Sequence, residues 1–375
     1  MDASSVGYSA AQAVRTGGKA EVRRALVTAR GRTLRLADAF EQPLASQGLR
    51  VPYRATLNPP LWEWGHVAWF QESWVGQGAS LLPNADALYD SSHVAHAARW
   101  ELALPDVRQT RAYMAATLEQ TLGALEALES AGDDELYFFR LVALHEEMHA
   151  EAACYMAESL GIAVPRDVLH EAALLDQGKV PVRLPAQEFV AGWRGQGFAF
   201  DNELQALAVQ LDAFEIDAQP VSWERFLEFA RADGYRNRTW WDDGGWDWLA
   251  RNGVPDHEPH AQLGRAAVHL TAFEAQAWCR WAGRRLPTEF EWECAALASP
   301  AFSWGQVWEW TASAFEPYPG FEPHAYRDYS APWFGSRRVL RGACPATSPS
   351  LAHPRYRNFF EPHRVDVFAG FRSCA

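Results

Sequence analysis

Hydrophobic and polar positions follow a helical period through the first 160 residues of the chain. Apolar side chains recur every three or four residues, and few Gly or Pro residues interrupt them. Such spacing places the apolar positions on one face of a helix. The pair Pro59-Pro60 stands where a helix would begin, with Asn58 as a candidate N-cap, and Gly161 follows the last periodic stretch as a stop signal. The pattern predicts helices over residues 20–39, 60–76, 106–130 and 133–160.

The pattern changes at about residue 165. Short apolar pieces now alternate with Gly, Pro, Asp and Asn, as is typical of strands and loops. Two helices are predicted, over residues 222–233 and 272–282, with a Trp-rich segment at 239–248 between them. Helices followed by a strand-rich part indicate the α+β class, and four helices with long connections favour a four-helix bundle. We expect a poorly ordered N-terminus (1–18), a helical bundle (19–165), a linker (166–185) and an α+β domain (186–375).

The composition narrows the class of partner. The 375 residues carry a net charge of −13, which disfavours nucleic acid or an anionic membrane as a partner, whereas 18 Trp residues suit a pocket with large flat side chains. No apolar stretch reaches the roughly 18 residues that cross a bilayer, and the N-terminus shows no signal-peptide pattern. Five cysteines without a CxxC pair indicate a reducing compartment. We therefore expect a cytoplasmic protein, monomeric or homodimeric, that acts on small molecules.

Two histidines in the last predicted bundle helix are the best candidates for chemistry. His145 and His149 are four residues apart, so one helical face carries both imidazoles, and His66 lies in the predicted helix 60–76. Three neutral nitrogens without a thiolate would form an open site, which is typical of catalytic metals. The alternatives are a coincidental surface pair and a core histidine with polar partners. Glu151, one position beyond Ala150, could orient an imidazole from outside the metal shell.

The segment His145-Glu-Glu-Met-His149 also fits the HExxH pattern of zinc proteases. That interpretation needs a third ligand and a glutamate base on the same helix. A zinc hydrolase therefore stays open as an alternative function.

Five arginines follow one another near the C-terminus of this acidic chain. Most of them are expected to form surface ion pairs. One or two could instead clamp a substrate carboxylate, for which the guanidinium fork is well suited. The five are Arg341, Arg355, Arg357, Arg364 and Arg372.

Several segments, in collinear order over residues 20–375, resemble the ergothioneine-type sulfoxide synthases. The stretch Asn58-Pro-Pro-Leu-Trp-Glu-Trp-Gly-His-Val-Ala-Trp-Phe-Gln-Glu72 is similar to their first-histidine segment, and His145-Glu-Glu-Met-His149 to their second histidine motif. The first half resembles DinB-like bundles, and the second half resembles formylglycine-generating-enzyme domains, which have a C-type-lectin-like fold. The matching pieces of the second half are Phe200-Asp-Asn-Glu203, Arg285-Leu-Pro-Thr-Glu-Phe-Glu-Trp292, Val307-Trp-Glu-Trp-Thr311, Val339-Leu-Arg-Gly342 and Tyr356-Arg-Asn-Phe-Phe360.

The resemblance implies a mononuclear non-heme iron(II) held by His66, His145 and His149, with O2 as co-substrate. In that family the iron centre joins a chalcogen donor to the imidazole C2 carbon of hercynine, the Nα-trimethylated histidine. Three facial histidines leave positions open for the substrates and O2. Aromatic rings suit the trimethylammonium group through cation–π attraction, so the Trp-rich segments 239–248 and 308–334 are candidates to bind it.

The resemblance also implies roles for residues around the metal. Asn358 lies where family members contact hercynine. Tyr326, Tyr329 and His93 are the candidate proton donors.

The donor side departs from the family's pattern at Ser92, His93, Met148, Phe359 and Phe360. Synthases that use γ-glutamylcysteine carry a Trp-Asp pair where this chain has two phenylalanines, so the carboxylate that holds the donor's amino group is lost. Paired tyrosines of a second class are replaced by Ser and His, and a Gln of the metal motif by Met. Arg364 still matches a donor-binding arginine.

These departures resemble most the selenoneine synthases, the branch that uses a selenosugar, since a sugar has no amino or carboxylate group to grip. The expected reaction joins selenium to hercynine C2. The alternatives are an ergothioneine-type hercynine sulfoxide synthase that uses cysteine or γ-glutamylcysteine, the zinc hydrolase, and a non-catalytic binding module. The intact set of three histidines argues against the last.

Overall fold

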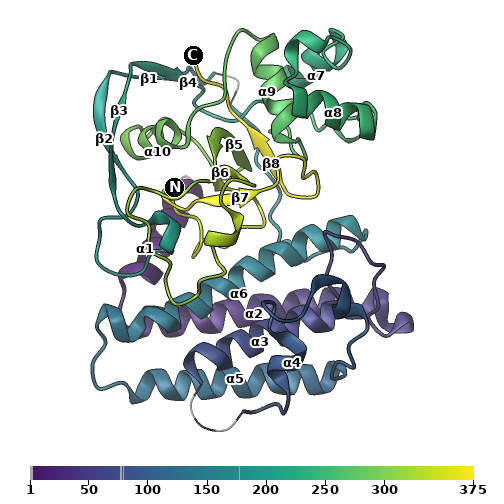
Figure 1. The fold of residues 1–375 in the computed structure, drawn as a ribbon, viewed down its shortest axis with the longest axis vertical. Coiled ribbons are helices and arrows are strands. Elements are labelled where there is room, and N and C mark those ends of the chain that lie inside the picture. The colour runs from purple at the N-terminus through teal and green to yellow at the C-terminus, as the bar shows by residue number, and fades with distance from the viewer. Residues whose placement is uncertain (1–2, 77, 79, 177) are drawn as a thin grey trace.

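The computed structural model describes the chain apart from residues 1–2, 77, 79 and 177, and it shows a helical half below a mixed half (Figure 1). The four predicted bundle helices are α2 (Lys19–Leu44), α3 (Pro60–Val75), α5 (Val107–Ala127) and α6 (Asp133–Ser159). Helix α2 packs on α6 and α5, and α3 packs on the same two helices. The four therefore form a bundle, and its likeness to DinB-like bundles stays a prediction.

The ends of the bundle helices follow from local chemistry. At the start of α5, the Asp106 side chain accepts from the Gln109 N–H at 2.8 Å, and Gln109 Oε1 accepts from the Asp106 N–H at 3.0 Å. The N-cap of α3 is Pro59 and not Asn58 as predicted. The Asn58 amide instead donates to Glu63, one turn into the helix.

Helix α1 (Ala3–Thr16) lies in the segment for which we expected poor order. Arg15 is buried and forms a bidentate pair with Glu203 of the mixed half, with both N–O distances at 2.8 Å. The Phe198 N–H donates to the Arg15 carbonyl oxygen at 2.8 Å. An ion pair of this kind holds α1 on the mixed half, and Figure 1 shows α1 near the label N.

Three small sheets build the mixed half. Strand β1 (Val182–Leu184) pairs antiparallel with β4 (Phe214–Ile216), and β2 (Gln187–Ala191) pairs antiparallel with β3 (Leu207–Leu211). Since β1 lies inside the expected linker 166–185, that segment is in part a strand of the domain. The largest sheet has the order β7-β6-β5-β8, in which only β8 runs parallel to its neighbour. Its strands are β5 (Val307–Ala314), β6 (Arg338–Ala343), β7 (Asn358–Phe360) and β8 (Ala369–Phe371).

Helices flank these sheets, and two of these helices were not predicted from the sequence. The predicted pair is α7 (Trp223–Arg231) and α9 (Ala272–Trp281). Helix α10 (Glu289–Ala298) carries a readable signal, because Thr288 and Glu291 form a capping box. Helix α8 (Asp243–Asn252) lies in the Trp-rich segment, where two glycines, which have a low helix propensity, weaken the helical pattern. The short elements are α4 (Ala85–Tyr89), η1 (Ala45–Gln47), η2 (His96–Trp100), η3 (Asp201–Glu203), η4 (Arg238–Trp240), η5 (Glu258–His260) and η6 (Ala331–Trp333).

A cluster of buried hydrophobic residues, the shared core, runs through both halves, and smaller clusters lie within the halves. It joins Phe70 and Leu144 of the bundle to Trp308 and Leu340 of the central sheet, and all four are buried. The two halves are therefore packed as one body and not linked loosely. No helix in the described part of the chain is long and apolar enough to span a bilayer.

Four of the five C-terminal arginines pair with glutamates, and three of the four are buried and not at the surface as expected. Arg341, Arg357 and Arg372 are at most 1% exposed. Buried guanidinium groups need carboxylate partners, because an unpaired charge in the interior is very costly. The pairs are Arg341–Glu289, Arg341–Glu293, Arg355–Glu293, Arg357–Glu289 and Arg372–Glu309.

Candidate metal centre

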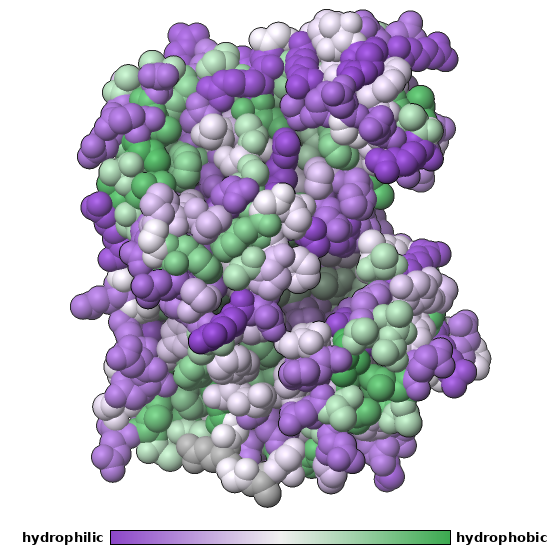
Figure 2. Space-filling view, in the orientation of Figure 1, coloured by the Kyte–Doolittle hydropathy of each residue, from purple (hydrophilic) through white to green (hydrophobic). Residues whose placement is uncertain are grey.

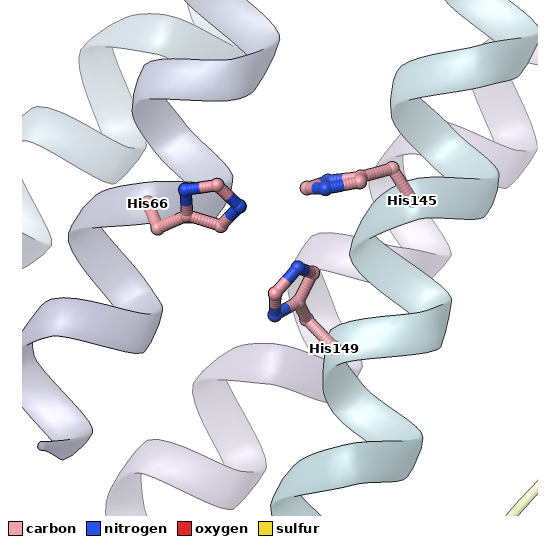
Figure 3. A group of neighbouring side chains, drawn as sticks. All are labelled: His66, His145 and His149. Carbon is pink, nitrogen blue, oxygen red and sulfur yellow. The ribbon is translucent and has the colours of Figure 1, made fainter. Parts of the chain in front are cut away.

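Three imidazoles converge in the space between α3 and α6 (Figure 3). His66 comes from α3, while His145 and His149 project from successive turns of α6. One ligand atom of each residue lies within 4.8 Å of those of the other two. The structure thus brings together the three histidines that the sequence singled out, at a spacing that one metal ion can bridge.

Hydrogen bonds set which nitrogen of each ring can act as a ligand. His66 Nδ1 lies 2.8 Å from the Tyr89 carbonyl oxygen, which can only accept, so this nitrogen carries the proton. His149 Nδ1 lies 2.6 Å from Glu63 Oε2 and donates to it in the same way. Both rings therefore keep the Nε2 lone pair for a metal, as in most histidine metal sites.

A glycine makes the first of these contacts possible. A Cβ atom at Gly65 would lie 2.1 Å from the Tyr89 ring, which is inside the van der Waals limit. Only glycine lets α4 end this close to α3 and present the Tyr89 carbonyl to His66.

Burial keeps two of the three imidazoles, those of His66 and His145, neutral. Burial and the neighbouring His149 lower the pKa of His66 to about 3, and burial with the other two histidines lowers the pKa of His145 well below its usual range. Burial alone would raise the pKa of Glu63, but the charge and hydrogen bond of His149 lower it to about 2. His66 and His145 can therefore bind a metal without first losing a proton. A nitrogen-only donor set suits iron, zinc or copper.

A second layer of contacts supports the centre. Glu63 Oε1 accepts from the Asn58 amide, and Asn58 Oδ1 accepts from Arg99 Nη1 at 2.8 Å. The Arg99 guanidinium stacks on the Trp62 ring at 3.7 Å, and that ring stacks on His66 with centroids 4.7 Å apart. The chain of contacts from Glu63 back to His66 fixes two ligands at once.

The two glutamates between the α6 histidines point away from the metal position. Glu146 pairs with Arg30 of α2, with Oε1 2.7 Å from Nε, and Glu147 pairs with Arg32 at 2.9 Å. A zinc protease needs the Glu146 carboxylate as its base, and here that carboxylate neutralises an arginine on another helix.

The expectation that Glu151 orients an imidazole is wrong. Its Oε1 accepts from the Tyr155 hydroxyl and from Trp308 Nε1, the latter at 2.7 Å. Glu63 has that role instead. Sequence reasoning passed over Glu63 because its partner His149 lies 86 positions away.

A cavity of about 630 Å3 adjoins the histidines and is lined by both halves of the molecule. Figure 2 shows that the surface is hollowed between the halves. The Trp-rich segment 239–248 does not line this cavity, whereas Tyr326, Tyr329 and Trp333 of the segment 308–334 do. The predicted site residues that line it are Ser92, Met148, Tyr326, Tyr329, Asn358, Phe359, Phe360 and Arg364, with His145 and His149.

His93 is the predicted site residue that the structure places elsewhere. Its side chain is 83% exposed, and its Nδ1 lies 2.7 Å from Asp90 Oδ2. The imidazole points to solvent, while the preceding Ser92 faces the cavity and donates to Asp328 Oδ2 at 2.6 Å. We therefore remove His93 from the candidate proton donors.

Four tyrosines of the described chain line the cavity, Tyr155 from α6 and three from the mixed half. The Tyr326 ring lies edge-on to His145, with centroids 6.1 Å apart, and burial raises the pKa of Tyr326 to about 12. The Tyr329 hydroxyl lies 3.3 Å from the Tyr356 hydroxyl, and the Tyr356 hydroxyl lies 3.3 Å from Met148 Sδ. Tyr356 was not predicted as a site residue, although it begins the quoted motif that ends at Phe360.

The charged side chains along the cavity are mostly acidic. Among its described lining residues, apart from the histidines, four carry a carboxylate and two a guanidinium. Such a balance favours a cationic ligand over an anionic one. The carboxylates are Glu63, Glu151, Asp328 and Asp366, and the guanidinium groups are Arg99 and Arg364.

Known proteins match this chain over most of its length. Hercynine oxygenase of Mycolicibacterium thermoresistibile is 31% identical over 430 aligned positions, which cover 94% of each chain. Hercynine oxygenase of Mycobacterium tuberculosis is also 31% identical, and the match covers 92% of this chain and 96% of that protein. Formylglycine-generating enzyme of Streptomyces coelicolor is 26% identical, over 47% of this chain and 80% of that protein.

The second half matches a domain family as well. The sulfatase-modifying factor enzyme 1-like domain (FGE-sulfatase) matches residues 169–306 and 301–375, which include every strand of the mixed half. Matches of this extent, over both the histidine-bearing bundle and the mixed half, show that the chain belongs to the hercynine oxygenase family.

Proposed function

We propose that this protein is an O2-dependent, iron(II)-containing enzyme that joins selenium of a selenosugar to the imidazole C2 carbon of hercynine. The observation that carries the proposal is the convergence of His66, His145 and His149 beside a cavity shared by both halves. Membership of the hercynine oxygenase family supports hercynine and O2 as substrates.

The donor set fits iron. Three nitrogen ligands leave room around a metal ion for two substrates and O2, whereas structural zinc sites are usually closed by four ligands. When bound, iron supplies the redox chemistry that couples O2 to bond formation. The chain's own part is to fix the ligands, since the Tyr89 carbonyl orients His66 and Glu63 orients His149.

The cavity suits a trimethylammonium group. Aromatic faces attract a cation that has no N–H to donate, and nearby carboxylates add to the attraction. Tyr, Phe and Trp side chains line this cavity together with more carboxylates than guanidinium groups. Asn358, at the start of β7, is the polar group that we assign to hercynine.

The donor side supports a neutral donor. Phe360 stands at the position where the resemblance implies a carboxylate for an amino group, and it offers no such contact. Arg364 is engaged with Asp366, with Nε 2.5 Å from Oδ1, so it is not free to clamp a donor carboxylate. Both observations favour a selenosugar over cysteine or γ-glutamylcysteine.

Tyr326 is the proton donor that we propose. Its ring contacts His145, and its raised pKa of about 12 keeps the phenol protonated. The Tyr329 hydroxyl is directed toward Tyr356 and Met148 instead. In the balanced reaction, the C2 hydrogen and the selenol hydrogen leave in water with one oxygen atom of O2, and the other oxygen atom stays on selenium.

Two alternatives give different products. An ergothioneine-type hercynine sulfoxide synthase would use cysteine or γ-glutamylcysteine on the same metal centre. A zinc hydrolase would need Glu146 as a base, and the Arg30–Glu146 ion pair argues against it.

The decisive experiment loads the metal-free protein anaerobically with iron(II) or zinc. It then supplies hercynine, O2 and one of three donors: a selenosugar, cysteine or γ-glutamylcysteine. We expect mass spectrometry to detect a hercynine–selenium adduct with iron only, and with the selenosugar as the best donor. His145→Ala should abolish both iron binding and product. Full turnover by that variant, or by the zinc-loaded protein, would contradict the proposal.

A further inference from the structure

Arg364 and Asp366 form a closed pair on the wall of the metal cavity. Arg364 Nε lies 2.5 Å from Asp366 Oδ1, and Nη2 lies 2.5 Å from Oδ2. Both side chains line the cavity that His145 and His149 also line, and the guanidinium lies over the Phe360 ring at 5.1 Å. Two parallel bonds are the geometry in which a guanidinium holds a carboxylate most strongly. The fork of Arg364 is therefore occupied from within the chain.

This pair changes what the donor side can bind. A free guanidinium would attract a donor carboxylate, whereas the paired one is largely neutralised. An incoming carboxylate would have to displace Asp366 and leave it as an unpaired anion in a cavity that already holds Glu63, Glu151 and Asp328. A hydroxyl group can donate to Asp366 and accept from Arg364 without separating them.

The loop that carries the pair is held from both halves of the molecule. His269 Nδ1 lies 3.0 Å from the Val365 carbonyl oxygen, and His269 Nε2 lies 3.2 Å from Glu158 in the last turn of α6. His269 has a φ of 62°, a conformation that a non-glycine residue adopts at an energetic cost. Because Val365 lies between the paired residues, its bond to His269 limits how far the pair can open.

We propose that Asp366 determines donor selectivity: it occupies Arg364 and thereby excludes selenol or thiol donors that carry a carboxylate. The donor class that fits is neutral and hydroxylated. This inference rests on the proposed function, since it concerns the second substrate of the same reaction.

The test is a change of donor preference. Asp366→Ala should release the Arg364 fork, so that the ratio of kcat/KM for cysteine to that for a selenosugar rises by roughly tenfold or more at saturating hercynine. The matched control is Glu361→Gln, which removes a carboxylate from the same loop outside the cavity, where Glu361 pairs with Arg337 at 3.2 Å. The control should keep the wild-type ratio, and the same ratio in Asp366→Ala overturns the inference.

Binding without turnover separates this inference from the proposed function. Calorimetric titration of the metal-free protein with cysteine should show roughly tenfold tighter binding to Asp366→Ala than to wild type. If wild type makes no product with any donor but the variant gains this binding, the proposed function is wrong, and only the exclusion of carboxylates from Arg364 by Asp366 stands. If wild type uses the selenosugar and the variant gains nothing, the inference is wrong and the function stands. Asp366→Asn, which keeps the side-chain size, gives the same comparison if Asp366→Ala fails to fold.

Discussion

Glu63 is the buried carboxylate that holds one of the three histidines proposed as metal ligands. Its Oε2 lies 2.6 Å from His149 Nδ1, and its other oxygen accepts from Asn58. A carboxylate in this position orients the ring and raises the basicity of the ligating nitrogen. The contact joins α3 to α6, so one side chain sets both the tautomer of His149 and its distance from His66.

Replacement of Glu63 should weaken the metal site without destroying the fold. We expect Glu63→Gln to lower iron(II) affinity by roughly 10–100-fold, because a glutamine is a poorer partner for the Nδ1–H group. Anaerobic competition against a chelator of known affinity measures the effect. Glu72→Gln is the control, because Glu72 lies on the same helix but bonds to Tyr113. Equal affinities in the two variants would contradict the role of Glu63.

Tyr326 and Tyr329, two of the tyrosines that line the cavity, have different surroundings. Tyr326→Phe should lower kcat by roughly 10²-fold or more if Tyr326 is the proton donor, while iron binding stays at the wild-type level. Tyr329→Phe should have a smaller effect, since its hydroxyl bonds to Tyr356. Single-turnover kinetics with saturating hercynine provide the comparison. A loss confined to Tyr329→Phe would reverse the assignment.

At the scale of elements, α1 shows how a charge pair docks a helix. Arg15 and Glu203 are both fully buried, and they are 188 positions apart in the chain. Arg15→Ala leaves a buried carboxylate without its partner, so the free energy of unfolding should fall by about 3–5 kcal/mol. Arg23→Ala is the control, because its pair with Glu126 is half-exposed and contributes roughly 0–1 kcal/mol. Urea denaturation of the metal-free variants measures both, and similar losses in the two would contradict this role for Arg15.

The elements that could be predicted from the sequence are those whose signals are local. The bundle helices follow from apolar periodicity over 16–27 residues, and His145 with His149 from one helical turn. Contacts between segments that are distant in the sequence could not be predicted, and these contacts determine the remaining features of the fold and of the candidate site. The docking of α1, the turn of His93 toward solvent and the engagement of Arg364 by Asp366 all depend on how side chains meet in three dimensions.

At the scale of the whole molecule, the shared core makes the two halves depend on each other. The proposed metal ligands come from the bundle, whereas Tyr326, Asn358 and Arg364 come from the mixed half. The shared core, which includes Phe70 of the bundle and Leu340 of the mixed half, holds these groups in fixed positions relative to one another. We infer that unfolding of either half would dismantle the cavity, so stability and activity should be lost together.

Acid should destabilise the molecule through buried neutral histidines, and His353 is the one far from the metal ligands in sequence. It is 1% exposed, and burial together with the charges of Arg15, Arg355 and Arg341 lowers its pKa well below 6.5. Below pH 6.5 the unfolded chain therefore binds a proton that the native protein does not, and the free energy of unfolding falls as the pH falls. One such group contributes up to about 1.4 kcal/mol per pH unit to the free energy of unfolding.

Urea denaturation of the metal-free protein between pH 6.5 and 5 should show this slope, and His353→Gln should reduce it by that amount. The exposed His363 provides the control variant, His363→Gln, and equal slopes for the two variants would show that His353 is not a source of the acid sensitivity.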